Sequence, residues 1–465
     1  MKRLQYIIAT LLAVATTVST ATAKDVNSFF MPNAIDRLDL NAALTIDRGY
    51  VSIPIIGGTS FSTNGNIALG DIFYPVDDSL VPLTDPSVSS STALGNLNSD
   101  SNRMSLGLNT TIFSIGKWTK RDWFWNFDVS LKSTTSINMP YSLAEFIRKA
   151  PEQTTINDLS IYMDSYSEMA FGLSIPVNDK LRVGGRVKAL IGLASAEINI
   201  DELTITANDE LWEAKGSGSI DINMSGVEST SGSSTFELGD IDFETPNSIA
   251  GWGVGVDLGA TYQLLDKLEL SASVNNLGFM RWSSKNNLHG DLSSSFSFSG
   301  FGVDVDGEDV ETNYDDNLLD LEEMLLFDET ESSDNTYMLQ ADFNLGAQYS
   351  LWRGRASAGI LYSAEFIRTF TQHSITAGGS ITPIKCLSLS AAYTINAQST
   401  NSLGLAINFC IPGLNIYVAT NLLGAELTPQ YIPIDKSSAD VSFGLSIALA
   451  SRKNKQNKAE RKSAM

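Results

Sequence analysis

Apolar and polar residues alternate along most of this chain, and one hairpin shows the pattern plainly. Its first arm places these apolar residues on one face: Phe171, Leu173, Ile175 and Val177. After the turn at 178–180, the second arm does the same with Leu181, Val183, Val187, Ala189, Ile191 and Leu193. A period of two residues is that of a β-strand. The pattern therefore predicts two strands, 167–177 and 181–193, joined by a tight turn.

The same alternation predicts fourteen strands in the whole chain. They are 59–69, 103–113, 121–133, 167–177, 181–193, 251–264, 267–277, 338–350, 355–367, 373–382, 386–396, 402–410, 414–421 and 440–450. Short connections such as 178–180 and 265–266 alternate with connections that are mostly long, such as 194–250 and 278–337.

This sorting of connections decides between two all-β folds. The half-exposed sheet of a soluble sandwich would explain one hairpin, but it gives no reason for short and long connections to lie at opposite ends. Outer-membrane barrels have short periplasmic turns and long outer loops. We therefore predict a transmembrane antiparallel β-barrel of about 14 strands, whose closure removes unpaired edges. Aromatic residues near the short turns are expected to form an interfacial girdle: Trp118, Trp123, Trp125, Tyr262, Tyr349, Trp352, Phe409 and Tyr417.

The N-terminus carries a secretory signal. Lys2 and Arg3 precede an apolar stretch at 7–18, and the small residues at 21–23 form a cleavage site. No later run reaches the ~18 to 20 apolar residues that a membrane helix needs. The chain is expected to divide into a signal peptide at 1–23, a plug-like or periplasmic segment at 24–58, the barrel at 59–450 and a basic periplasmic tail at 451–465.

The faces opposite the apolar ones predict a lumen with charges of both signs. By the parity of each strand, the inward charged residues are Asp128, Lys132, Glu168, Arg182, Arg186, Lys188, Asp257, Glu269 and Asp342. Pairing Val177 with Leu181 sets the register of the hairpin and places Lys188 diagonal to Glu168. The register predicts a lumenal ion pair from Glu168 to Lys188 or Arg186.

Composition excludes several classes of function. The chain has 53 acidic against 31 basic residues and a net charge of -22, which excludes nucleic acid as a partner. His289 and His373 are its two histidines, and neither belongs to a zinc-binding or nucleophile-elbow pattern. Because no nucleophile and base can be paired, we predict no enzyme activity, no metal site and no cofactor.

Two of the long connections contain predicted short helices. Residues 301–336 hold fourteen acidic residues and neither Lys nor Arg, with apolar residues at helical spacing in 317–327. The segment 304–309 is too short and wrongly spaced for an EF-hand, so a solvated acidic loop is favoured over a calcium or ligand site. Ser142 and Glu145 form a capping box before a second short helix. Both helices are expected to cover the mouth of the barrel.

Cys386 and Cys410, the only two cysteines, are predicted to be neighbours. They are equidistant from Gln398, the centre of a predicted hairpin, and the compartment beyond a signal peptide permits oxidation. Opposed residues have Cα atoms ~4.5 to 5.5 Å apart, within reach of a disulfide. A disulfide is predicted, with two reduced thiols as the alternative because cross-strand bridges are often strained.

Three blocks of sequence resemble a known family. They are "RGYVSIPIIGG" (48–58), "INMPYSLAEFIRKAP" (137–151) and "SEMAFGLSIPVNDKLRVGGRVKALIGLASAEINID" (167–201). They resemble blocks of an uncharacterised outer-membrane barrel family, a domain of unknown function, of Bacteroides-type bacteria. That family is similar in plan to the long-chain fatty-acid transporter-like barrels, so the resemblance implies a barrel without an established activity. The chain departs from the pattern at "LNAAL" (40–44), where "LNPAF" is expected, and in lacking a terminal aromatic residue after Ala450.

Two functions follow as hypotheses. The resemblance and the segment 24–58 favour a channel for hydrophobic or poorly soluble small molecules in the outer membrane of a Gram-negative bacterium. The acidic loops favour a structural or surface-binding barrel that transports nothing. The expected partners are outer-membrane lipid and, for a channel, a hydrophobic small molecule.

Overall fold

The computed structural model of the chain describes residues 25–54, 56–76, 79–83, 85, 87–149, 151–206, 212–243, 248–298, 325–426, 434–435 and 437–451. The expected signal peptide, residues 452–465 of the tail and residues 317–324 of the expected acidic helix lie outside these described residues.

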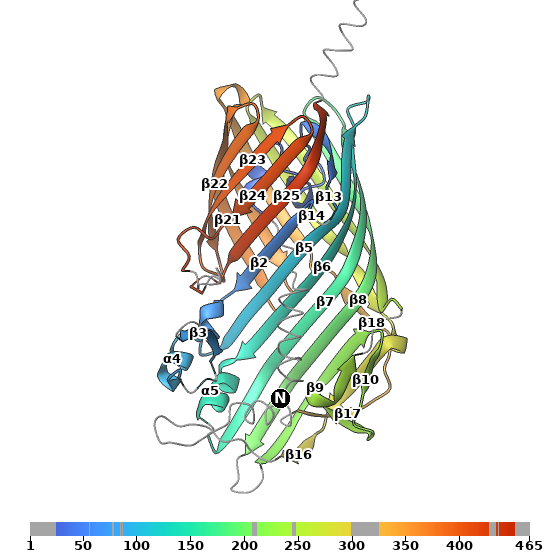
Figure 1. Cartoon of the computed structure of the whole chain (residues 1–465), viewed down its shortest axis with the longest axis vertical. Coiled ribbons are helices and arrows are strands. Elements are labelled where there is room, and N and C mark those ends of the chain that lie inside the picture. Colours follow the sequence, from blue (N-terminus) through green and yellow to red (C-terminus); the bar gives the residue numbers. More distant parts are fainter. Residues whose placement is uncertain are drawn as a thin grey trace, which may run out of the picture.

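A closed antiparallel barrel of 14 strands forms the body of the protein, as predicted (Figure 1). Its wall consists of β1 (Arg48–Ser52) with β2 (Thr59–Gly65), β5 (Ser101–Trp118), β6 (Phe124–Pro140), β7 (Gln153–Pro176), β8 (Leu181–Thr206), β13 (Gly251–Leu265), β14 (Leu268–Trp282), β19 (Asp342–Leu351), β20 (Ala356–Phe366), β21 (Thr371–Ile384), β22 (Leu387–Asn396), β23 (Ser402–Ile411), β24 (Leu414–Thr420) and β25 (Ala439–Ser451). The barrel closes because β1 and β2 both pair with β5 on one side and β25 on the other.

The first strand of the wall is made in two pieces. Residues 53–58 interrupt it between β1 and β2, and they include Pro54, which cannot donate to the ladder, and the pair Gly57-Gly58. The wall therefore begins at Arg48, so residues 48–52 belong to the barrel and not to the N-terminal segment in which we expected them.

The outer face of the wall is apolar, as the alternation predicts. Its exposed side chains include Phe171, Val187, Val254, Leu258, Ile360, Ile375 and Ile407. The predicted register of the hairpin formed by β7 and β8 is confirmed, since Glu168 lies opposite Leu190. The predicted directions of its side chains are confirmed as well, because Val187 is 61% exposed and Arg186 is 3% exposed. An outward apolar surface on a closed barrel is a lipid-facing surface.

The aromatic girdle is smaller than expected. Tyr262, Tyr349 and Trp352 are exposed on the outer face near the short turns. Trp118 faces the lumen instead, and its indole N–H donates to the carbonyl of Ile46 at 2.8 Å. A β-bulge between Thr111 and Phe113 shifts the alternation of β5 by one residue, which turns Trp118 inward.

Tyr417 also faces the lumen, where it is 3% exposed and its hydroxyl contacts the carboxylate of Asp25. Its neighbour Val418 holds the outward position on β24 and is 44% exposed. Both corrected aromatic residues pack against the N-terminal segment, so their apolar rings are buried by protein and not by lipid.

Several strands continue far beyond the ~9 to 11 residues that span a membrane. β7 has 24 residues and β8 has 26 residues. Much of the sequence that we expected to form the long connections 194–250 and 278–337 is therefore strand. It includes β9 (Trp212–Met224), β10 (Val227–Ser229), β11 (Thr235–Glu237), β12 (Ile241–Phe243), β15 (Asn287–Leu292), β16 (Ser295–Phe298), β17 (Leu326–Glu329) and β18 (Asn335–Met338).

These additional strands build an outer module at the long-loop end, which is at the bottom of Figure 1. β9 pairs with the far half of β8 and with β15 and β16, while β17 pairs with β15 and β11. The module has its own core, in which Ile156, Leu203, Ile220, Phe236 and Phe327 are almost fully buried. This separate core explains why the strands continue where lipid ends.

Short helices accompany this end of the barrel, as expected. α5 (Tyr141–Lys149) lies where "PYSLAEFIRKAP" predicted a helix, and it buries Ala144 and Phe146. α4 (Ser90–Gly95) begins after Ser89, whose hydroxyl accepts from the N–H of Thr92. The small sheet of β3 (Phe73–Val76) and β4 (Ser79–Pro82) lies nearby. Residues 326 and 327, the end of the predicted acidic helix, belong to β17 instead. Among the described residues, no helix has both the length and the apolar character needed to cross a membrane.

A closed barrel resists unfolding by detergent at room temperature, because every strand edge is hydrogen-bonded. We expect unboiled and boiled samples of the mature protein to migrate differently on a detergent gel. The measurement needs only extracted membranes, and identical migration of both samples would contradict a closed barrel.

Candidate functional site

Residues 25–47, which we call the plug, lie inside the barrel. They include two single-turn helices, α2 (Asn27–Phe30) and α3 (Arg37–Leu40). Polar side chains of the wall hold the plug through its backbone. The carbonyl of Leu40 accepts from Ser273 at 2.6 Å and from Asn275 at 3.0 Å, and that of Phe30 accepts from Ser380 at 2.7 Å. The small polar residues on the inward face of the wall therefore fix the plug.

Inward glycines let the plug approach the wall closely. A Cβ atom at Gly184 would lie 2.0 Å from the carbonyl oxygen of Ala42, and one at Gly346 would lie 2.4 Å from the ring of Phe29. Either substitution would collide with the plug. This contact explains why glycine recurs on the inward face of strands whose outward face is continuously apolar.

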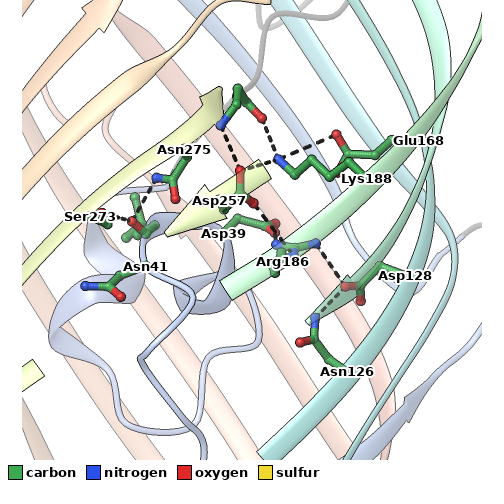
Figure 2. Close-up of polar contacts among 12 residues, drawn as sticks. Asp39, Asn41, Asn126, Asp128, Glu168, Arg186, Lys188, Asp257, Ser273 and Asn275 are labelled. Carbon is green, nitrogen blue, oxygen red and sulfur yellow. Dashed lines mark hydrogen bonds and ion pairs between the residues drawn. The ribbon is translucent and has the colours of Figure 1, made fainter. Parts of the chain in front are cut away.

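Arg186 connects the plug to the wall at the centre of a buried ion-pair network (Figure 2). Its guanidinium contacts Asp39 of the plug, lies 2.9 Å from the carboxylate of Asp128 on β6, and lies 3.8 Å from that of Asp257 on β13. The Arg186 side chain is 4% exposed. One planar, permanently charged group thus joins three elements that are distant in sequence.

Two lysines extend this network toward the long-loop end. Lys188 lies 2.8 Å from Asp257 and 3.7 Å from Glu168, and Lys132 lies 2.9 Å from the same carboxylate of Glu168. The predicted pair of Glu168 with Lys188 is present, although Lys132 is the closer partner. Three cations therefore face four carboxylates, counting Asp39.

The structure brings six of the nine charged residues named from sequence into this network and places the other three elsewhere in the lumen. Arg182 pairs with Asp122 at 3.1 Å near the short turns. Glu269 interacts electrostatically with Arg37 of the plug. Asp342 accepts from Asn275 at 2.8 Å and from a second asparagine, Asn344, at 2.6 Å.

Asp39 is the member of the network that sequence reasoning missed. It lies in a helix of four residues, so neither the period of a strand nor that of a long helix marks its direction. The only available signal was its position in a segment expected to enter a lumen that contains inward arginines.

The predicted disulfide is wrong, because Cys386 and Cys410 are both free thiols. The predicted register is correct, since Leu387 lies opposite Phe409 and the N–H of Cys410 donates to the carbonyl of Cys386 at 2.8 Å. Cys386, however, lies in the turn before β22 begins, so the geometry of the strand ladder does not direct its side chain toward Cys410.

This correction gives a direct prediction. Alkylation of the protein unfolded without reductant should label both Cys386 and Cys410, as measured by mass spectrometry. The matched control is the same sample reduced first, which should show no additional label. Label that appears only after reduction would restore the disulfide.

An apolar cavity of about 330 Å³ lies beside the network toward the long-loop end. Met280, Trp282, Leu339 and Tyr166 form much of its apolar lining, and Arg368 and Asp164 supply charge. Met280 and Trp282 are 4% and 1% exposed. A cavity of this volume is in the range of ligand-binding pockets.

The same cavity reaches the outer surface of the wall. Its lining includes Met338 and Phe366, which are 76% and 51% exposed. Between them the ladder is interrupted at residues 339–341, where β18 ends and β19 begins. Asn276 on the neighbouring strand has a positive φ of 57°, at the β-bulge between β13 and β14. Part of the lining of the cavity therefore lies at the outer surface of the wall, at the junction of β18 and β19.

An exposed ion pair marks the limit of the lipid-facing surface toward the long-loop end, beside this junction. Arg281, which follows Met280 on β14, lies 2.8 Å from Asp334 on the outer face, and both side chains are well exposed. The backbone N–H of Ser284 and the side chain of Arg281 lower the pKa of Asp334 to about 2, so the pair is charged. Exposed charged groups belong in water, which places the junction of β18 and β19 at the boundary between lipid and water.

A second, polar cavity of about 30 Å³ lies between the plug and the wall, lined by Asp36 and Asp39 on one side and Asn109 and Thr111 on the other. It has room for water only.

Among the described residues, no group of three or more His, Cys, Asp or Glu side chains could hold a metal ion. His289 contacts Asp221 at 2.8 Å, and His373 contacts a tyrosine hydroxyl at 2.9 Å.

Comparison with known proteins gives the family and similar folds. No curated protein matches the sequence. A Pseudomonas aeruginosa FadL homologue is 11% identical over 93% of this chain and 96% of its own, with a TM-score of 0.45. The Ralstonia pickettii toluene transporter TbuX is 10% identical over 92% of this chain and 94% of its own, with a TM-score of 0.41. The Pseudomonas putida toluene transporter TodX is 9% identical over 92% of this chain and 94% of its own, with a TM-score of 0.40. The family model described as "Family of unknown function (DUF5723)" matches residues 42–421, and the chain belongs to this family.

Proposed function

We propose that the protein binds hydrophobic small molecules and passes them across the bacterial outer membrane. The observation that carries the proposal is the apolar cavity, which lies inside a lipid-spanning barrel and has part of its lining at the outer face of the wall, at the junction 339–341 of β18 and β19. A hydrophobic solute gains free energy by leaving water for such a cavity. A purely structural role would not account for an apolar cavity inside a polar lumen.

The orientation of the barrel is part of this proposal. The outer module and the helices α4 and α5 face the outside of the cell, and the short turns and both termini face the periplasm. The sorting of short and long connections supports this orientation, because outer-membrane barrels place short turns in the periplasm. The cavity then lies on the outer side of the plug.

A molecule in the cavity meets the ion-pair network and the plug before it reaches the periplasm. Thr134, Asp164 and Tyr166 line the cavity, while Lys132 and Glu168 of the same two strands belong to the network. The two features are therefore neighbours along β6 and β7. Passage requires a rearrangement of the plug, because its backbone is hydrogen-bonded to the wall on several sides.

Filling the cavity should block transport. We expect Leu339→Trp to lower uptake of an apolar fluorescent solute into liposomes containing the protein by more than about fivefold, because the larger ring occupies the apolar space. Leu345→Trp is the matched control, since Leu345 is 44% exposed on the lipid-facing side of β19. Equal uptake by both variants and the unmodified protein would contradict transport through this cavity.

A non-transporting, surface-binding barrel is the second candidate function. The outer module favours it, because a separate hydrophobic core makes a stable platform outside the membrane. The two candidates differ in a simple result. Liposomes containing the intact protein take up an apolar solute faster than empty liposomes only if the barrel transports it.

A further inference from the structure

We infer that the cavity selects uncharged, largely apolar molecules that carry a hydrogen-bond acceptor, such as long-chain alcohols, and rejects the corresponding carboxylates. The inference rests on the proposed function, whose cavity it uses, and it names the class of molecule that the cavity takes. Two independent features carry it: a buried hydrogen-bond donor in the lining and a surplus of negative charge among the ionised side chains in and directly around the lining.

The donor is the indole N–H of Trp282. Trp282 lines the cavity and is 1% exposed, and its Nε1 has no hydrogen-bond partner among the described residues. A Cβ atom at Gly192 would lie 2.6 Å from Cζ3 of Trp282, and one at Gly251 would lie 2.9 Å from Cε3. These two atoms are on the edge of the indole opposite Nε1, so the N–H edge points away from β8 and β13.

A buried donor without a partner is costly, and a ligand that supplies an acceptor removes that cost. A hydroxyl, ether or carbonyl oxygen on an otherwise apolar molecule would do so. A pure hydrocarbon would fill the apolar space and leave the Trp282 N–H unpaired. The cavity should therefore prefer an alcohol to an alkane of the same chain length.

The charge in and around the lining opposes a carboxylate. Arg368 is the only cation among the residues that line the cavity, and its charge is already compensated. Its guanidinium lies 2.6 Å from Glu197 and 3.8 Å from Asp164, and it is stacked between the rings of Tyr162 and Tyr337 at 4.3 and 3.9 Å.

One cation with two carboxylates leaves this end of the cavity with a net negative charge. The adjacent network, with three cations and four carboxylates, is negative as well. A further carboxylate that enters the cavity would be both desolvated and repelled. A free fatty acid in its ionised form is therefore excluded, whereas a neutral head group is not.

The test uses the full-length protein in lipid nanodiscs and three probes of equal chain length: decane, decanol and decanoate. Equilibrium dialysis of radiolabelled probe against loaded and empty nanodiscs at neutral pH gives the three affinities. We expect decanol to bind about fivefold more tightly than decane, as one additional hydrogen bond allows, and decanoate to bind more weakly than both.

Two variants assign the effect to its residues. Trp282→Phe keeps an aromatic ring and removes the donor, so it should abolish the preference for decanol while decane binding stays the same. Trp125→Phe is the matched control, because that ring stacks on Phe171 at the outer face. Glu197→Gln removes one negative charge and still accepts from Arg368, so it should raise decanoate affinity about tenfold.

The outcomes separate the inference from the proposed function. If decane and decanol bind equally well, or if decanoate binds most tightly, the inference is wrong and the hydrophobic cavity stands. If Trp282→Phe keeps the preference for decanol, the indole is not the selecting group and the inference is again wrong. If no probe binds to the loaded nanodiscs, the proposed function itself fails.

Discussion

Replacing Arg186 by methionine is expected to destabilise the folded barrel by about 3–5 kcal/mol, the usual cost of removing one partner from a buried ion pair. The substitution leaves the carboxylates of Asp39, Asp128 and Asp257 close together without the group that lies between them. Lys188 still pairs with Asp257, but no other cation contacts Asp39 or Asp128 among the described ion pairs. Unfolding in guanidinium, followed by tryptophan fluorescence, measures the change.

Arg182→Met is the matched control for this substitution. Arg182 lies on the same strand and the same face, and it also donates to the carbonyl oxygens of Ser174 and Asp122. The carboxylate that it pairs with, that of Asp122, belongs to a side chain that is 33% exposed, so water can replace the lost charge. We expect a smaller loss there, about 1 to 2 kcal/mol, from the hydrogen bonds that are removed. Protease cleavage of the plug should increase for Arg186→Met and stay unchanged for Arg182→Met. Similar unfolding midpoints for both variants would show that the network does not stabilise the barrel.

The direction of each side chain in the wall could be predicted from sequence because the period of a strand relates every residue to its neighbours. Once Val177 was paired with Leu181, the inward positions of Glu168, Arg186 and Lys188 followed without further information. The prediction failed where the period was broken. The bulge in β5 turned Trp118 inward, and the turn that contains Cys386 removed that residue from the ladder.

The height of the barrel could not be predicted in the same way. Alternation indicates that a residue lies in a sheet with one buried face, but it does not say whether the other face meets lipid or water. β8 therefore continues from the lipid-facing Val187 to Ile205, which packs in the core of the outer module, with no signal in the pattern where lipid ends. The expected loops were strands for this reason.

Sequence could predict only those residues of the candidate site that lie on the strands of the wall. Six inward charges of the network were named from the strands, but Asp39 and the cavity depend on how the plug and the interruption at 339–341 are placed. These features come from contacts between segments distant in sequence, such as Asn41 of the plug with the carbonyls of Ala260 and Ala272. No local pattern encodes such contacts.

Removing the plug is expected to convert the barrel into an open aqueous pore. Barrels of 8 strands are filled by their own side chains and those of 16 to 18 strands enclose a water-filled channel, so a barrel of 14 strands without its plug has room for water. The wall that the plug leaves behind is polar, since it carries Ser273, Asn275 and Ser380 as donors. Such a lining hydrates readily.

The experiment deletes residues 25–47 and keeps Arg48, because β1 belongs to the wall and its loss would open the barrel seam. We expect the flux of a small neutral sugar into liposomes to rise by more than about tenfold, because free diffusion through a hydrated lumen replaces a lumen filled by protein. A deletion of residues 452–465 is the control for the loss of a terminal segment and should leave sugar flux unchanged. Heat-dependent migration on a detergent gel verifies that each variant is folded. If the folded variant without its plug is as impermeable to sugar as the intact protein, residues 25–47 do not close the lumen, and the barrier must lie in the wall or in the outer module.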